Sequence, residues 1–393
     1  MVLTGFFPTD MSSTNRTITG SHTPLKILHL FRSPVGGLFR HVCDLIQAQI
    51  DQGLNAGIVC DSLTGGEFAN KMLEQLAPGC ALGVHRLPMS RLLNVSDLTS
   101  LYRVSKISRT LMPDIIHGHG AKGGAFARIL ARRHGAKSVY TPHGGSLHYK
   151  SASSAGFVYL GFERLLKGYT DGLIFESNYV ASEYRNKVGS VKNPCRVIHN
   201  GLKESEFHPV TCHGDCKNFL FVGELRKLKG IEVLLKAILR LRERHNVSLL
   251  IVGTGPHAGE IRSLIRDMGL ESSVTLSPPV FPAVRVFSQA ECLVIPSLAE
   301  SLPYIALEAA AAEVPLIASD VGGISEITGA YSDFLVPPDD PEALANAMYS
   351  VLTDRDKARR ISGHLHERVR YNFRLETMVK ETLEFYEQVI KST

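Results

Sequence analysis

The sequence contains no tryptophan and no apolar run of 18 or more residues, the length at which a segment becomes a candidate membrane span. It therefore predicts no transmembrane helix. It also lacks a clustered basic arm, and its 12 Tyr and 17 Phe are not interleaved with Lys and Arg. Proteins bind single-stranded DNA or RNA with aromatic side chains set among basic ones. The sequence therefore predicts no nucleic-acid partner.

Cysteine is scarce, and the seven residues show no repeated spacing. Cys43, Cys60 and Cys292 lie in apolar surroundings, which predicts reduced core residues in a reducing compartment. The segment 212–216 resembles half of a metal site, but no second half is evident, so a hydrophilic inter-domain loop is predicted. The first residues lack the basic start and apolar core of a signal peptide, and we expect a cytoplasmic protein.

The chain has 393 residues, which is too many for one ordinary core and predicts two domains. Its 44% hydrophobic and 21% charged residues are typical of a globular protein. The mild net charge of +5 fits anionic ligands or an anionic membrane surface. Arg128, Arg132 and Arg133 lie on one predicted helix, with Lys137 after it. This patch fits either a solvated face or a peripheral contact with the inner face of a membrane.

Short apolar strands alternate with stretches of helical spacing, which indicates parallel sheets with helices on both faces. Residues 200–218 interrupt the alternation with Gly, Pro, His and charges, and are predicted to connect two domains. We predict a disordered leader at 1–23, a first domain at 24–205, a second at 206–372, and a final helix at 373–393 that returns to the first domain. The predicted strands are 26–31, 56–60, 114–117, 138–141, 173–176 and 196–199, then 218–222, 248–252, 274–276, 292–295, 316–318 and 334–336. The predicted helices are 38–52, 97–111, 123–134 and 160–169, then 231–245, 257–268, 303–312, 341–352 and 375–390.

Two glutamates with seven residues between them mark the candidate site. The apolar run 292–295 predicts a buried strand, and the alanine-rich run 306–312 predicts a helix. Pro303 suits the first turn of that helix, and Ser301 is its predicted N-cap. Glu300 then lies in the turn, and Glu308 lies one to two turns into the helix.

The position of these two carboxylates favours a sugar nucleotide as ligand. Open α/β sheets bind ligands beyond the carboxyl ends of their strands, and a helix N-terminus there attracts a phosphate. Carboxylates accept hydrogen bonds from the hydroxyls of sugars. The alternative is structural: Glu300 caps the helix and Glu308 is exposed, although its alanine-rich surroundings disfavour that.

Several further motifs occur in a fixed order. They are Pro34-Val35-Gly36-Gly37 with His41, Asp114-Ile115-Ile116-His117-Gly118-His119, Thr141-Pro142-His143-Gly144, Val197-Ile198-His199-Asn200-Gly201, Val222-Gly223 with Lys229-Gly230, Val252-Gly253-Thr254-Gly255-Pro256, and the block from Glu300 to Glu308. Together they resemble the family 4 glycosyltransferases, from about Lys26 to Ile390. The resemblance implies the GT-B architecture, in which two Rossmann-like, doubly wound domains face each other across a cleft.

The resemblance also implies a reaction and roles for single residues. A retaining, metal-independent transferase would move a sugar from a nucleotide-diphosphate sugar to an acceptor hydroxyl, on a glycan or a lipid-linked acceptor. Glu308 would bind the donor ribose and Glu300 would lie by the donor sugar. Lys229 would neutralise the diphosphate, helped by the loop at Gly36 and Gly37, and no cofactor is implied.

Other positions follow from the same resemblance. His119 matches a histidine near the reacting centre, and a metal pair with His117 is its minor alternative. His143 ends another strand, where it would contact the acceptor or order the loop. For His41, on the first predicted helix, a structural role explains the residue at least as well as a functional one. Asp354-Arg355-Asp356 mimics a metal motif, but helix capping explains it better.

Two departures from the family pattern affect the donor site. Glu224 stands where the family often has Arg, and Arg226, two residues later, is predicted to supply the missing cation. Ser301-Leu302-Pro303 replaces a common Gly-Phe-Gly, so Leu302, Pro303 and Tyr304 are predicted to line a different sugar pocket. A GT-B-shaped nucleotide-sugar epimerase and a non-catalytic nucleotide-sugar-binding protein remain as alternative functions. The sequence gives no donor sugar, base or acceptor.

Overall fold

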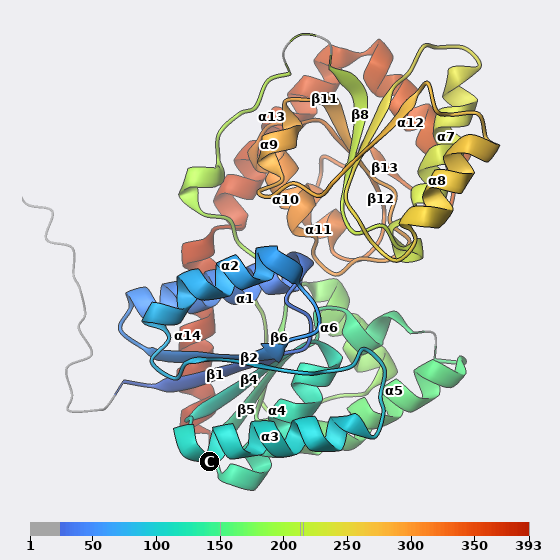
Figure 1. Ribbon diagram of the computed structural model, residues 1–393. Helices are drawn as coiled ribbons and strands as arrows, with labels where there is room; N and C mark the ends of the chain where they lie inside the picture. Colours follow the sequence, from blue (N-terminus) through green and yellow to red (C-terminus); the bar gives the residue numbers. More distant parts are fainter. Residues whose placement is uncertain (1–23, 150, 213, 215, 393) are drawn as a thin grey trace, which may run out of the picture.

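The computed structural model describes residues 24–392 apart from positions 150, 213 and 215, and it shows two α/β domains stacked one on the other (Figure 1). All strand pairs within both sheets are parallel. The predicted α/β class with two doubly wound parallel sheets is thereby confirmed. The predicted leader lies outside the described residues.

The first domain is a seven-stranded sheet in the order β3-β2-β1-β4-β5-β6-β7. Its strands are β1 (Lys26–Phe31), β2 (Asn55–Asp61), β3 (Val84–Leu87), β4 (Ile115–His119), β5 (Lys137–Thr141), β6 (Gly172–Phe175) and β7 (Cys195–Val197). Its helices are α1 (Gly36–Asp51), α2 (Gly66–Leu76), α3 (Ser96–Leu111), α4 (Gly120–His134), α5 (Ser154–Leu166) and α6 (Asn178–Lys187).

The second domain is a six-stranded sheet in the order β10-β9-β8-β11-β12-β13. Its strands are β8 (Lys217–Val222), β9 (Leu249–Val252), β10 (Val274–Ser277), β11 (Ala290–Ile295), β12 (Leu316–Ser319) and β13 (Leu335–Val336). Its helices are α7 (Ile231–Arg242), α8 (Ala258–Asp267), α9 (Val284–Phe287), α10 (Tyr304–Ala311), α11 (Ile324–Thr328), α12 (Pro341–Thr353) and α13 (Arg355–Asn372).

The last helix, α14 (Leu375–Lys391), lies beside the first sheet in Figure 1. Its buried residues Phe385, Tyr386 and Val389 share a core with Ile27 of β1 and Ile115 of β4. The chain therefore crosses between the domains twice, once after β7 and once before α14. Two segments of chain therefore join the domains.

Glycines let α4 lie directly on the sheet, and this fixes the end of β4 at the cleft. A Cβ on Gly123 would meet the carbonyl oxygen of Leu30, and one on Gly118 would lie 2.6 Å from the carbonyl oxygen of Gly123. Larger residues would push the helix away. His119 is the last residue of β4 and the N-cap of α4, so it is held at the carboxyl end of the sheet.

Six elements of the described chain were missed at the sequence level, namely β3, α2, α6, α9, α11 and α13, and one cap was wrong. β3 is a half-buried edge strand with polar His85 and Arg86, and α13 buries only a narrow stripe among charged residues. Neither shows a strong apolar period. Pro303, not Ser301, is the N-cap of α10. Asp354 does cap α13, since its carboxylate accepts from the N–H of Lys357 at 2.9 Å, as predicted.

The cysteines divide into two groups. Cys43, Cys60 and Cys292 are free and buried, as predicted. Cys212 and Cys216, predicted to lie in a plain hydrophilic loop, are joined by a disulfide in the segment that links the domains. The two cysteines are four residues apart in the sequence, and this spacing alone does not distinguish a disulfide from half of a metal site. None of the helices in the described part of the chain is long and apolar enough to cross a bilayer.

Candidate active site

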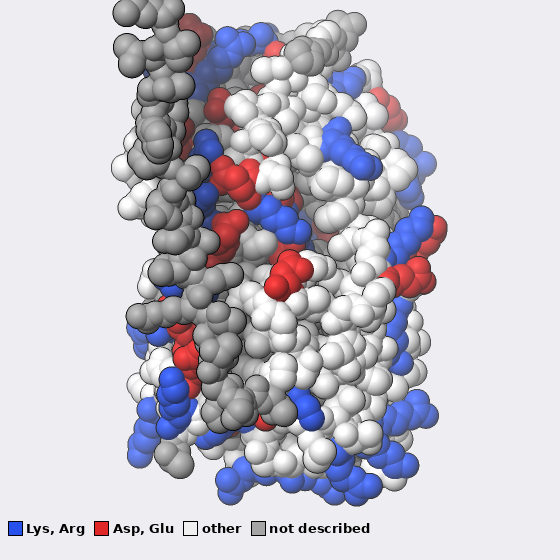
Figure 2. Space-filling model, turned by 90° about the vertical axis from the view of Figure 1, so that its left-hand side faces the viewer, with Lys and Arg blue, Asp and Glu red and all other residues white. Residues whose placement is uncertain are grey.

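The loops at the carboxyl ends of the two sheets face each other across the domain junction. Gly36, after β1, has φ +66°, in the left-handed region that favours glycine. A Cβ on Gly37 would lie 3.4 Å from Cδ2 of Tyr304, at the start of α10. The two predicted donor loops thus come from different domains and meet. Figure 2 shows Lys, Arg, Asp and Glu side chains mixed over this junction on one face of the molecule.

Glu308 points from α10 toward the first domain. Its Oε1 accepts a hydrogen bond from Nη1 of Arg40 on α1, and Arg40 also donates to Glu206. The Glu308 side chain is 12% exposed, and burial raises the pKa of its carboxyl although Arg40 opposes the shift. The structural alternative of an exposed Glu308 is therefore wrong. Arg40, which also stacks 4.6 Å from the centre of the Tyr304 ring, was not predicted.

Glu300 and Lys229 form a partly buried ion pair at the same junction. Nζ of Lys229 lies 2.5 Å from Oε1 of Glu300, and the Ser297 hydroxyl donates to the same oxygen at 2.7 Å. Burial alone would raise the pKa of Glu300, but Lys229 and these hydrogen bonds hold it below its ordinary value. Glu300 therefore stays ionised and keeps Lys229 in place. No helix-capping contact of Glu300 is present in this part of the described chain.

Arg226 lies near this pair but is not free. Its Nε is 3.4 Å from Oε2 of Glu224, and 37% of the side chain is exposed. Its charge also helps to lower the pKa of Glu300. The structure therefore brings Arg226, Lys229 and Glu300 together, while Glu224 offsets part of the charge of Arg226.

Five histidines gather at the end of the first sheet. Nδ1 of His29 lies 3.0 Å from Nε2 of His119, and Nδ1 of His119 lies 3.1 Å from Nε2 of His143. The other two are His117, whose Nδ1 lies 2.6 Å from the Tyr386 hydroxyl, and His41. Burial lowers the pKa of all five, to about 4 for His29 and His41. At neutral pH each imidazole is uncharged.

His41 links the domains through Asn200. Its Nδ1 lies 3.0 Å from Oδ1 of Asn200, and Nδ2 of Asn200 donates to the carbonyl oxygen of Leu302 at 2.8 Å. The Leu302 side chain is 3% exposed and packs in the core of the second domain, so only its backbone faces the junction. Pro303 follows as the cap of α10, and the Tyr304 ring is 6% exposed.

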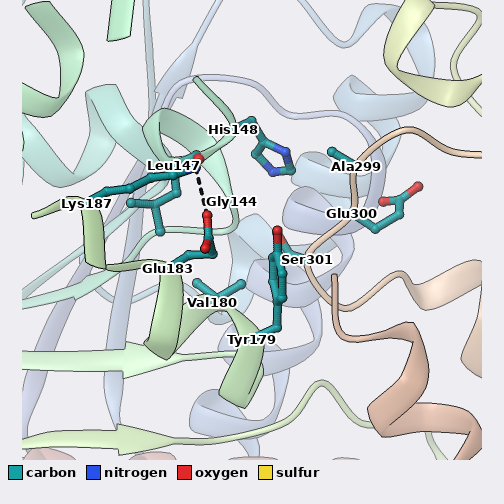
Figure 3. A pocket seen from close by; sticks show the side chains of 10 residues that line it. All are labelled: Gly144, Leu147, His148, Tyr179, Val180, Glu183, Lys187, Ala299, Glu300 and Ser301. Atoms are coloured by element: carbon teal, nitrogen blue, oxygen red, sulfur yellow. Dashed lines mark hydrogen bonds and ion pairs between the residues drawn. The ribbon is translucent and has the colours of Figure 1, made fainter. Parts of the chain in front are cut away.

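A cavity between the domains opens beside Glu300 (Figure 3). His148, Tyr179 and Glu183 line it from the first domain, and Ala299, Glu300 and Ser301 line it from one loop of the second. Its volume is about 70 Å³, far below the roughly 300–1,000 Å³ of small-molecule sites. In this conformation the cavity is too small for a nucleotide sugar, so donor binding at this place would need the domains to move apart.

Glu176 is a further buried acid that sequence patterns did not single out, since it was counted only as the end of a predicted strand. It follows β6, is 1% exposed, and lies beside His143 and Ser301. Burial raises its pKa from 4.5 to about 7. A carboxyl that titrates near neutrality at a domain junction makes stability depend on pH.

The expected result for Glu176→Gln is a stability gain that grows with pH. The unfolded chain releases the Glu176 proton near 4.5 and the folded chain near 7, so wild-type stability falls between those values. The difference corresponds to about 3 kcal/mol. Urea unfolding at pH 4.5 and pH 8 checks it: the variant should gain by about this amount at the higher pH relative to the lower. An equal effect at both values would contradict the shift.

Two family profiles match the chain. Residues 35–206 match the family described as Glycosyltransferase Family 4, and residues 216–354 match the one described as Glycosyl transferases group 1. The chain belongs to the family 4 glycosyltransferases. An uncharacterized glycosyltransferase of Methanocaldococcus jannaschii is 30% identical over 53% of this chain, and the chain spans 58% of that relative's length. The putative teichuronic acid biosynthesis glycosyltransferase TuaC of Bacillus subtilis is 27% identical over 72% of this chain and 73% of its own.

Solved structures show the same fold. HepE from Anabaena, in complex with UDP-glucose, superposes with a TM-score of 0.78 at 18% identity, and the match covers 93% of this chain and 100% of HepE. At this identity the likeness concerns the fold alone. The GT-B arrangement expected of a family 4 glycosyltransferase is therefore present.

Proposed function

We propose that this family 4 glycosyltransferase moves a sugar from a nucleotide-diphosphate sugar to an acceptor hydroxyl, with retention of the anomeric configuration and without a metal. The observation that carries the proposal is the meeting of Glu308, Lys229 and Glu300 with the Gly36-Gly37 loop at the domain junction. These groups supply hydrogen-bond acceptors for sugar hydroxyls and a cation for a diphosphate. The UDP-glucose bound to HepE supports a uridine nucleotide as the first donor to test.

Charge stabilisation of the leaving group is the central task in this reaction. The negative charge on the nucleoside diphosphate grows as the glycosidic bond breaks, and Lys229 would balance it, with Arg226 nearby. Glu300 holds Lys229 at 2.5 Å, so the cation is positioned before the donor binds. The acceptor hydroxyl would attack from the face that the diphosphate leaves, and its proton would pass to the departing phosphate oxygen. His119, which the resemblance puts near the reacting centre, stays neutral and shares hydrogen bonds with His29 and His143.

Incubation with a panel of labelled nucleotide sugars tests the proposal. The expected result is release of free nucleoside diphosphate, unchanged by a metal chelator, with transfer to a glycan or lipid-linked acceptor. NMR of the product gives the anomeric configuration, and inversion would contradict retention. Because TuaC is described as a putative teichuronic acid biosynthesis glycosyltransferase, cell-surface polysaccharides are the first acceptors to try.

The same assay separates the alternative functions. An epimerase returns an altered nucleotide sugar without needing an acceptor, and a binding protein returns the donor unchanged. Either outcome would replace the transferase proposal.

We also propose that the protein acts in the cytoplasm and touches an anionic membrane through a different surface from the one predicted. Arg128 is fully buried and pairs with Glu163 at 2.9 Å, so it does not belong to a surface patch. Lys137 donates to the carbonyl oxygen of Ser392. Arg132 and Arg133 remain exposed.

The apolar face of α5 is the better candidate for this contact. Phe157, Val158, Phe162 and Leu165 share one face at helical spacing and are 46% to 76% exposed. The segment 92–98 exposes Leu92, Val95 and Leu98 and is held to α4 by Lys122, whose Nζ donates to the carbonyl oxygen of Leu92. Exposed Arg91, Arg103 and Arg164 accompany the two segments, which fits an anionic bilayer rather than a neutral partner.

Phe157→Glu is expected to weaken binding to vesicles of anionic phospholipid at least about tenfold, because a buried Phe contributes roughly 1.5–3 kcal/mol. Sedimentation with such vesicles measures it. Tyr371→Glu is the matched control, since Tyr371 is 83% exposed on α13 of the second domain. Equal loss in both variants, or no binding by the wild type, would contradict the proposed surface.

A further inference from the structure

Three of the clustered histidines bring ring nitrogens close together at the end of the first sheet. The nitrogens of His41, His119 and His143 all lie within 4.8 Å of one another. We propose that these three residues form a binding site for a divalent transition-metal ion, with Zn²⁺ as the best fit, and that the bound ion blocks the donor site.

The tautomer of His41 is fixed from outside the cluster. Nδ2 of Asn200 donates to the Leu302 carbonyl oxygen at 2.8 Å, so its Oδ1 is the atom that faces His41. An amide oxygen only accepts, so Nδ1 of His41 carries the proton and donates across 3.0 Å. Nε2 of the neutral ring is then a bare lone pair. Metal-binding histidines commonly show this arrangement, with the second nitrogen held by an oxygen.

The tautomer of His119 follows from the orientation of the Gln49 amide, whose Oε1 faces His29 and whose Nε2 has no hydrogen-bond partner among the described residues. Oε1 of Gln49 lies 2.9 Å from Nε2 of His29 and only accepts, so His29 is protonated at Nε2 and bare at Nδ1. Nε2 of His119, 3.0 Å from that lone pair, must then be the donor. Nδ1 of His119 is left bare, and it accepts from Nε2 of His143 at 3.1 Å.

Two lone pairs therefore converge with a single N–H between them. Moving the His143 proton from Nε2 to Nδ1 turns His143 into a third ligand without changing any charge. A tetrahedral Zn²⁺ with Zn–N bonds of about 2.0–2.1 Å needs ligand nitrogens roughly 3.3 Å apart. The 3.1 Å between His119 and His143 is close to that edge. The other nitrogen pairs lie within 4.8 Å, so the His41 ring would have to move toward the other two as the ion binds.

The site draws on elements of one domain only: α1 supplies His41, β4 supplies His119, and the loop after β5 supplies His143. Domain opening therefore leaves the three ligands together. Its consequence for activity rests on the proposed function, which puts the reacting centre near His119. On that reading, a cation held there would take the space of the donor sugar and should compete with the donor.

Isothermal titration of Zn²⁺ into the full chain without a polyhistidine tag tests the binding. One ion per chain is expected, and His41→Ala should weaken it at least about tenfold, the size of loss seen for disrupted metal sites. His364→Ala is the matched control, because His364 is exposed and stacks on Tyr331 in the second domain. Absence of one-to-one binding, or unchanged affinity in His41→Ala, overturns the site.

The visible spectrum of the Co²⁺ form keeps the test valid if His41→Ala does not fold. The spectrum is expected to show nitrogen ligands and no thiolate charge-transfer band. A thiolate band would assign the ion to a cysteine, such as the exposed Cys195, and would overturn the proposal. Inhibition is measured separately. Zn²⁺ at ten times its dissociation constant should slow turnover about tenfold at low donor concentration, with reversal by a chelator. Binding without inhibition would overturn the blocking role, and a chain that binds Zn²⁺ but shows no transfer would overturn only the proposed function.

Discussion

Replacing Lys229 by methionine is expected to lower kcat of sugar transfer by about 10²–10³-fold, the cost of removing one group that stabilises developing charge in an active site. Methionine keeps the length of the side chain and removes its charge. The loss should appear mainly in kcat, because charge accumulates on the diphosphate only as the bond breaks. Steady-state release of nucleoside diphosphate measures it.

The ion pair with Glu300 means that the Lys229 substitution can also change stability, and a double variant at both positions controls for this. Without Lys229 the buried Glu300 carboxylate loses its counter-charge, which destabilises the fold. The double variant Lys229→Met, Glu300→Gln removes both charges, so a stability effect should recover in it while the loss of kcat remains. Lys227→Met controls for the local turn, since Lys227 is 75% exposed and pairs with Glu260. A variant at Lys229 with kcat within a few-fold of wild type would rule out the leaving-group role.

The sheets of both domains were predictable because their strands are short, continuous apolar runs between turns. Buried parallel strands such as β1, with the sequence KILHLF, give that signal in any context. β3 and α13 gave none, because an edge strand and a charged helix depend on their neighbours for burial. Local pattern thus predicted the elements whose own sequence is a continuous apolar run.

The residues of the candidate site also separate into those that local motifs predicted and those that they did not. Glu300, Glu308 and Lys229 stand in motifs with fixed spacing, and the structure brings them to one junction. Arg40 was missed because its contact with Glu308 joins residues 268 positions apart, on helices of different domains. His29 and Gln49 were missed for the same reason, since their role depends on the side chains that end at the same edge of the sheet. Contacts between side chains that are far apart in the chain leave no trace in sequence spacing.

Glu308→Ala is expected to weaken donor binding by about 100-fold or more. A carboxylate that accepts from two ribose hydroxyls contributes roughly 1.5–3 kcal/mol for each charged hydrogen bond, and alanine removes both. Titration calorimetry with UDP measures the loss without requiring an acceptor. Because Arg40 already occupies Glu308 in the described structure, the donor must compete with it, and domain opening separates the two.

The contact with Arg40 demands a control that perturbs the same arginine and leaves α10 intact. Glu206→Gln meets this need, since Glu206 accepts from Arg40 but lies in the linking segment. Both variants should lower thermal stability by loosening a partly buried charge cluster. Only Glu308→Ala should lose affinity for UDP. If both lose it equally, the effect comes from the docking of the domains through Arg40, and Glu308 does not hold the ribose.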